Sequence, residues 1–336
     1  MGFNEKDKFL NEKIQPFNPY KIKNLDDLLN SLKYCGFQGR NLGIAHNILY
    51  KMVKDENCLT ILTLSGAMVP AGMQKIIVQL LENNLIDVLV STGANIIHDL
   101  IDSFLDGGHY IGSPHVIDDN LFEHRINRIY DTFLPEDNYI KTEKILLEFL
   151  KELYPNKIID EPPSEFLNKL GSKIEQKSIL SVSNKKGIPI FVPAISDSEL
   201  ALDLTKFTST QDFKVNFKVI EDIKKFAEIV GAADYCGTFI IGGGVPRNWA
   251  QQIYPYIEDL ERETNPDSKY EFGYKYSVRI HTATEYDGGL SGCTISESKS
   301  WGKYSLDSNY ISLWCDATIA LPVLVTGLIQ RLKNDA

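Results

Sequence analysis

This chain of 336 residues holds few cysteines. Their arrangement argues against a fold stabilised by disulfide bonds and against one stabilised by a zinc ion. The five cysteines are scattered and odd in number, and no two have the C-x-x-C spacing, so neither a disulfide framework nor a structural zinc site is indicated. The six histidines do not form H-E-x-x-H or another metal-binding spacing. We therefore expect no metal ion, and we expect a cytoplasmic protein, because free thiols persist in a reducing compartment.

Long apolar runs and an excess of basic charge are also missing. The longest apolar run, residues 319–329, is far too short to span a bilayer, and the polar N-terminus has no apolar core of the kind found in signal peptides. With 35 basic and 45 acidic residues the formal net charge is −10, which disfavours binding to a nucleic-acid backbone. We expect neither a membrane nor a nucleic acid as partner, and this charge suits a cationic small molecule better.

Short apolar runs alternate with longer segments of helical periodicity. The runs predicted as strands are residues 59–63, 86–92, 188–193, 238–241, 276–280 and 311–315. Residues 219–230 carry a helical apolar stripe, and Thr142 is predicted to cap a helix that ends before Pro155. Because such strands are continuously apolar, the pattern predicts an α/β fold: a doubly wound, mostly parallel, Rossmann-like sheet with helices on both faces. We expect one domain over residues 51–336, with residues 1–50 as a helical segment packed on it.

Small residues follow several predicted strands, at the sheet edge where ligands bind in parallel sheets. Ser65 follows the first strand, Thr92 and Gly93 follow the second, and Gly242-Gly243-Gly244 follows the fourth. Such glycines let the backbone approach a phosphate, although a tight strand-to-helix turn needs them equally. Asp316 after the last strand either accepts a hydrogen bond from a ribose hydroxyl or caps the next helix. Together these turns indicate a dinucleotide site.

The run Ser300-Trp301-Gly302-Lys303 contains a candidate nucleophile. A lysine amine attacks carbon only when it is neutral, so its pKa would have to fall from about 10.4 toward roughly 7–8. If this segment is extended, Trp301 and Lys303 point to the same side, and the indole face can attract an ammonium group. The alternative is an ordinary exposed lysine beside a core tryptophan.

An ordered set of motifs from about residue 25 to about residue 330 resembles the deoxyhypusine synthase family. The motifs are Gly36-Phe37-Gln38, Asn127-Arg128 with Pro135, Ile190-Phe191-Val192-Pro193-Ala194 with Asp197, Ile240-Ile241-Gly242-Gly243-Gly244-Val245, Thr282-Ala283-Thr284-Glu285-Tyr286-Asp287-Gly288-Gly289, Glu297, Ser300-Trp301-Gly302-Lys303 and Asp316-Ala317. The resemblance implies oxidation of spermidine with NAD, transfer of its aminobutyl group through a lysine imine to an acceptor amine, and a homotetramer whose active sites form at a dimer interface.

The resemblance also implies roles for individual residues, with Lys303 as the catalytic lysine. It implies substrate binding by Gly288, Glu297, Trp301, His98 and Asn248. It implies NAD binding by Ser65, Thr92, Gly93, Asp197, Gly243, Gly244, Thr282, Ala283, Asp316 and Ala317.

Several positions depart from the family pattern. Ile97 and His98 stand where the family has an acidic pair, Leu202 and Leu290 each replace an acidic residue, and Asn248 replaces a histidine. Because buried ammonium groups need paired carboxylates, this pocket is expected to hold a polyamine differently from the typical enzyme. We expect an aminobutyltransferase with a small acceptor such as putrescine, which would give homospermidine. Two alternatives stay open: an authentic deoxyhypusine synthase that modifies a lysine of a translation factor, and a non-catalytic paralogue that binds NAD.

Overall fold

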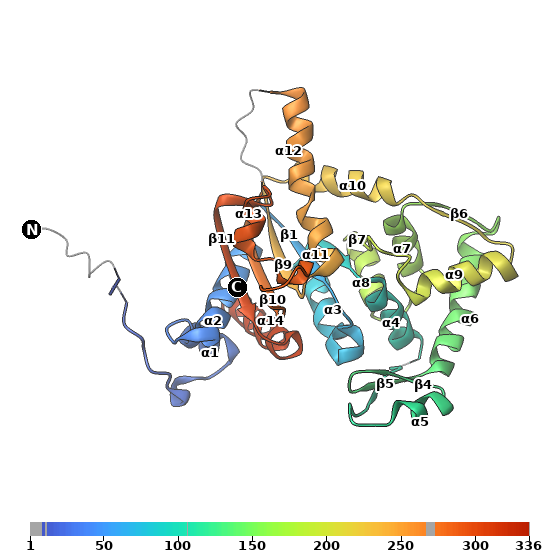
Figure 1. Cartoon of the computed structure of the whole chain (residues 1–336), viewed down its shortest axis with the longest axis horizontal. Coiled ribbons are helices and arrows are strands. Elements are labelled where there is room, and N and C mark those ends of the chain that lie inside the picture. The colour runs from blue at the N-terminus through green and yellow to red at the C-terminus, as the bar shows by residue number, and fades with distance from the viewer. Residues whose placement is uncertain (1–8, 11, 106, 267–272, 336) are drawn as a thin grey trace, which may run out of the picture.

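A six-stranded parallel sheet forms the centre of the protein, seen in a computed structural model that describes residues 9–10, 12–105, 107–266 and 273–335 (Figure 1). The strand order is β11-β10-β9-β1-β2-β7, and every neighbouring pair is parallel. The strands are β1 (Cys58–Leu64), β2 (Val88–Ser91), β7 (Ile190–Phe191), β9 (Tyr235–Ile241), β10 (Tyr274–His281) and β11 (Tyr304–Trp314). Each predicted run overlaps one of them, and the predicted fold class is confirmed.

Both faces of this sheet are buried, which explains why its strands are apolar at successive positions. Ile61 and Leu62 are adjacent in β1, yet they belong to two separate buried clusters. Successive side chains of a strand point to opposite faces, so each cluster occupies one face of the sheet. Strand β7 is shorter than predicted because Pro189 and Pro193 flank it, and proline cannot donate an N–H to a strand ladder.

Helices contribute the remaining side chains of each buried cluster. The larger cluster takes side chains from α2 (Phe37–Lys54), α3 (Gln74–Glu82), α4 (Gly93–Phe104), α6 (Glu136–Leu153), α7 (Pro163–Gly171), α8 (Ile179–Lys186), α9 (Glu199–Thr210) and α14 (Ala317–Asn334). The smaller takes them from α10 (Val219–Gly231), α11 (Gly244–Gln251), α12 (Ile253–Thr264) and α13 (Ile295–Lys299). Among the described residues, no helix combines the length and apolar character that a membrane span requires.

Smaller elements surround this core. They are α1 (Leu25–Leu32), α5 (Asp118–Glu123), an antiparallel sheet of β3 (Tyr110–Ile111), β5 (Thr132–Pro135) and β4 (Ile126–Ile129), a parallel pair of β6 (Ile158–Glu161) and β8 (Lys214–Phe217), and the short turns η2 (Pro19–Lys21), η3 (Val69–Met73) and η4 (Leu290–Gly292). Figure 1 shows β4, β5 and α5 grouped at one end of α6. Residue 50 lies inside α2, and the division between residues 1–50 and 51–336 stays a prediction.

The predicted cap at Thr142 is wrong. Helix α6 begins at Glu136, and Thr142 is fully buried in its interior. The helix begins directly after Pro135, which has an extended backbone and fits the position before a helix. Glu136 and Asp137 place negative charge in the first turn, where the helix dipole favours it. The helix ends at Leu153, before Pro155, as predicted.

The crossing of α1 and α2 depends on a glycine. A Cβ built on Gly43 would lie 2.4 Å from the backbone nitrogen of Lys33 and 2.6 Å from the carbonyl oxygen of Leu29. A Cβ on Gly39 of the same helix would meet only Leu32 Cδ2, at 3.7 Å. We predict that Gly43→Ala lowers the free energy of unfolding by about 1–3 kcal/mol, because backbone atoms cannot move aside.

The control is Gly39→Ala, for which we expect no loss and a gain of up to about 1 kcal/mol from helix propensity. Urea unfolding followed by circular dichroism measures both variants. Equal stability of the two variants would show that α1 and α2 do not pack this closely.

Candidate active site

The first of two neighbouring cavities lies at the carboxyl ends of the central strands and has a volume of about 290 Å³. It is lined by Ser65, Gly66, Ser91, Thr92, Gly93, Ala194, Asp197, Gly243, Gly244, Val245, Pro246 and Ser291. Six residues of the predicted NAD set are therefore brought together here: Ser65, Thr92, Gly93, Asp197, Gly243 and Gly244.

Glycines bring the backbone close to this cavity. A Cβ on Gly93 would lie 2.4 Å from Ser198 Cβ, and one on Gly243 would lie 2.9 Å from Ser291 Oγ. Gly244 has a φ of +62°, which disfavours other residues. Helices α4 and α11 both begin at this cavity, so two helix N-termini present N–H groups and positive dipole ends to it. This donor set fits the phosphates of a dinucleotide.

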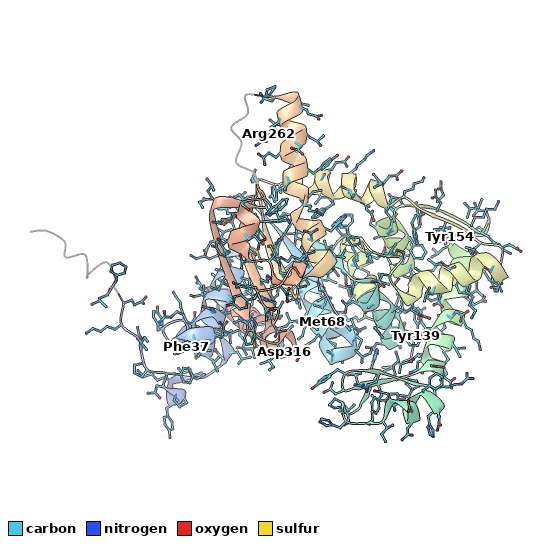
Figure 2. The ribbon with its side chains drawn as sticks, in the orientation of Figure 1. Phe37, Met68, Tyr139, Tyr154, Arg262 and Asp316 are labelled. Carbon is cyan, nitrogen blue, oxygen red and sulfur yellow. The ribbon has the colours of Figure 1, made fainter. Side chains whose placement is uncertain are left out.

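The remaining residues of the predicted NAD set lie at the same edge of the sheet but not in the lining of this cavity. Thr282 and Ala283 follow β10, and Asp316 and Ala317 follow β11. Figure 2 shows Asp316 at this edge of the sheet, where β11 ends. Asp316 Oδ1 accepts a hydrogen bond from the backbone N–H of Thr318 at 2.8 Å, so the side chain caps α14, as its alternative interpretation predicted.

The second cavity, of about 450 Å³, adjoins the first across η4, because Leu290 lines the second cavity and Ser291 lines the first. It is lined by Asn248, Gln252, Pro255, Glu285, Asp287, Gly288, Gly289, Leu290, Cys293, Glu297, Trp301 and Lys303. The predicted nucleophile Lys303 thus shares one cavity with four of the five predicted substrate residues: Asn248, Gly288, Glu297 and Trp301.

Lys303 lies half-buried in this cavity. Its Nζ donates a hydrogen bond to Asn248 Oδ1 at 3.0 Å and lies 5.9 Å from the ring centroid of Trp301. Burial lowers the pKa of Lys303; the adjacent Cys293 and Glu297 oppose this change, whereas Arg247 adds to it. The pKa of Lys303 is therefore shifted in the direction that a nucleophilic amine requires.

This segment is not extended, so the condition under which Trp301 and Lys303 would point to the same side is not met. Trp301 and Gly302 form a turn after α13, and Gly302 has a φ of +68°. The turn forms because the backbone N–H groups of Trp301 and Lys303 both bond to the carbonyl of Ser298. Trp301 is 66% exposed, so it is not a core tryptophan, and it lines the cavity together with Lys303.

His98 lies outside the lining of both cavities, on the face of α4 that approaches Tyr139 of α6 (labelled in Figure 2). Its Nδ1 is 2.9 Å from His109 Nε2, and His109 Nδ1 is 2.7 Å from Asp102 Oδ1. Burial lowers the pKa of His98 to about 4, which favours a neutral imidazole. Its contact with a substrate stays a prediction.

The other departures from the family pattern lie in different places. Asn248 and Leu290 line the Lys303 cavity, whereas Ile97 is buried in the core and Leu202 is 59% exposed on α9. Of the positions that differ from the family pattern, only Asn248 and Leu290 therefore place uncharged side chains in the cavity that contains Lys303.

Sequence reasoning did not assign roles to two acidic residues of the Lys303 cavity, Glu285 and Asp287. Both carboxylates flank the glycine loop, and Asp287 Oδ1 also accepts the N–H of Gly289 at 2.7 Å. With Glu297 they give the cavity three carboxylates, which attract a cation. The sequence feature that could have identified them is their position next to a glycine-rich loop.

The fold and these two cavities define a class: a Rossmann-like α/β protein in which a partly desolvated lysine adjoins a cavity suited to phosphates. The chain belongs to the deoxyhypusine synthase family, whose model matches residues 27–328. This family consists of transferases that move aminobutyl groups.

Relatives match the chain over nearly its whole length. It is 40% identical to a protein named probable deoxyhypusine synthase 2 of Archaeoglobus fulgidus, over 88% of this chain and 94% of the relative. It is 35% identical to a deoxyhypusine synthase-like protein of Chlorobaculum tepidum, over 97% and 91% of the two chains. A crystal structure assigned as a deoxyhypusine synthase from Entamoeba histolytica has the same fold, with a TM-score of 0.63 at 20% identity, over 94% of this chain and 97% of that one.

The capping role of Asp316 gives a test of its predicted role toward NAD. We predict that Asp316→Ala lowers the free energy of unfolding by about 1 kcal/mol, because α14 loses its cap. Asp316→Asn keeps an acceptor for the Thr318 N–H, so we expect unchanged stability. If Asp316 also binds the ribose, NAD affinity measured by calorimetry falls in both variants, and more in Asp316→Ala. Unchanged affinity in both would leave Asp316 as a helix cap alone.

Proposed function

We propose that this protein transfers the aminobutyl group of spermidine to an acceptor amine through a covalent imine at Lys303. The observation that carries this proposal is the amine of Lys303, which is half-buried and held by Asn248 Oδ1 at 3.0 Å, in a cavity of about 450 Å³ that three carboxylates also line. Membership in the deoxyhypusine synthase family supports the reaction class.

The cavity has the features that a polycation requires. Glu285, Asp287 and Glu297 supply negative charge, and the exposed indole face of Trp301 supplies a surface for an ammonium group. Burial of the Lys303 amine favours its neutral form, and its hydrogen bond to Asn248 orients it. The site therefore attracts a charged amine, while burial shifts its own amine toward the neutral form.

The first cavity and the residues after β10 and β11 would hold NAD, with phosphates at the N-termini of α4 and α11. When bound, NAD accepts hydride from the polyamine carbon next to nitrogen and later returns it. Lys303 then adds to the electrophilic carbon, the bond from this carbon to the diaminopropane nitrogen breaks, and the aminobutyl group stays on the protein as a C=N linkage. An acceptor amine displaces Lys303 in the same way.

The acceptor in this proposal is a small diamine such as putrescine, which gives homospermidine. Asn248 and Leu290 leave the cavity wall beside Lys303 without charge, so a long polyamine meets fewer ionic partners there. A homotetramer in the cytoplasm, with sites completed at a dimer interface, belongs to the same proposal. The names of the relatives favour a second candidate, a lysine of a translation factor as acceptor.

We predict that Lys303→Ala and Lys303→Arg both abolish transfer, because a methyl group and a permanently charged guanidinium cannot form the imine. Borohydride reduction in the presence of spermidine and NAD should trap an aminobutyl adduct on Lys303, detected by peptide mass spectrometry. Lys299→Ala is the matched control, since Lys299 lies on α13 and donates to the Leu306 carbonyl instead. Full turnover by folded Lys303→Ala would refute the covalent mechanism.

The acceptor is tested separately. The protein is incubated with spermidine, NAD and labelled putrescine, and polyamines are resolved by mass spectrometry; we expect labelled homospermidine. A parallel reaction replaces putrescine with the translation factor of the same organism and uses spermidine that is labelled in its aminobutyl group. Labelling of the factor without homospermidine would transfer the assignment to protein modification.

A further inference from the structure

Two arginines are buried behind the Lys303 cavity. Arg247 on α11 is 2% exposed and Arg279 on β10 is 1% exposed. Arg247 Nη2 donates to the Cys293 carbonyl at 2.8 Å and to Ser298 Oγ at 3.3 Å, and Arg279 Nη1 donates to the same carbonyl at 2.9 Å. Two guanidinium groups thus share one carbonyl acceptor, and both hold the segment that leads to Lys303.

Arg279 extends this anchoring to both cavities. Its Nε donates to the Gly242 carbonyl at 3.1 Å, and its Nη2 donates to the Ser291 carbonyl. Gly242 precedes the turn at the first cavity, and Ser291 lies in η4 between the cavities. The pair therefore ties the two cavity walls together through backbone oxygens.

Neither arginine has a carboxylate partner among the residues that the structure describes. Within the same residues, Nε and Nη1 of Arg247 are buried without a hydrogen-bond partner. Burial and the adjacent charge of Arg247 lower the pKa of Arg279 to about 9, and it still stays protonated at neutral pH. Burying unpaired positive charge is unfavourable, so its presence here requires an explanation.

The charged and titratable groups around Lys303 differ in burial. They are Arg247 on α11, Glu258 on α12, Glu285 and Asp287 after β10, Cys293 after η4, and Glu297 on α13. The carboxylates of Glu285, Asp287 and Glu297 are exposed, so water and salt screen them, whereas the arginines are screened much less. Burial of the amine is the largest cause of the lowered pKa of Lys303, and the buried charge of Arg247 adds to it.

We propose that Arg247 and Arg279 are positioning residues for Lys303: both hold the segment from Ser291 to Ser298, and the unpaired charge of Arg247 disfavours a second positive charge on the Lys303 amine. The connection is short, because the Lys303 backbone N–H donates to the Ser298 carbonyl at 3.3 Å and Arg247 is followed directly by Asn248, which accepts the Lys303 amine. The purpose of this arrangement rests on the proposed nucleophilic role of Lys303.

The test measures how readily Lys303 is acetylated by trace acetic anhydride from about pH 6 to about pH 11, since only a neutral amine reacts. Peptide mass spectrometry reads Lys303 against exposed lysines of the same sample. In Arg247→Gln we expect the midpoint of Lys303 labelling to rise by about one pH unit, a tenfold loss of reaction below the midpoint. Arg247→Lys, which keeps the charge, should stay near the native midpoint. If Arg247→Gln does not fold, Arg247→Met, which removes the charge and keeps a long apolar side chain, replaces it with the same expected direction.

The control is Arg128→Gln, because Arg128 lies on β4 and pairs with Asp118 of α5, in the group of elements at one end of α6 (Figure 1). An unchanged midpoint in folded Arg247→Gln or Arg247→Met, or an equal rise in Arg247→Lys, would overturn the proposal. Labelling needs neither polyamine nor NAD, so it separates the two proposals. A shifted midpoint without a trapped imine would refute only the proposed function, and a trapped imine with an unchanged midpoint would refute only this inference.

Discussion

Parallel pairing of six strands is the constraint on which the site depends, because it brings every carboxyl end to one edge of the sheet. The turns after β1, β2 and β9 meet there and form the first cavity, and the segment between β10 and β11 forms the second. Ser65 and Lys303 are distant in sequence, yet the cavities that they line share the wall formed by η4. A shift in the pairing of β9 with β1 or β10 would separate these walls.

Electrostatics within the Lys303 cavity follow from which charges are in contact with water. Its carboxylates are exposed and attract a cation from solution, while Arg247 is buried and acts on the amine with little screening. The same cavity can therefore attract ammonium groups and still favour a neutral Lys303. A lysine among three carboxylates in open water would instead hold its proton more tightly.

Much of the fold could be predicted, because strands that are apolar at every position are stable only when both faces are covered. The errors were local. Thr142 was expected as a cap from its residue type, but Pro135 and the acidic first turn start α6 earlier. An extended segment at Trp301 was considered only as a condition, and hydrogen bonds to the Ser298 carbonyl close a turn there instead. Residue preferences of this kind are weak, and contacts with neighbouring segments override them.

The sequence alone was sufficient to identify Lys303, the glycine turns after the strands and the family, since these reside in residue types and their order. It did not reveal that Glu285 faces the same cavity as Lys303, that His98 lies beside His109, or that Arg247 is buried. Burial and the distances between remote segments arise when the helices and the sheet pack. The pKa of a side chain depends on those quantities, so the chemistry of the site was settled by packing.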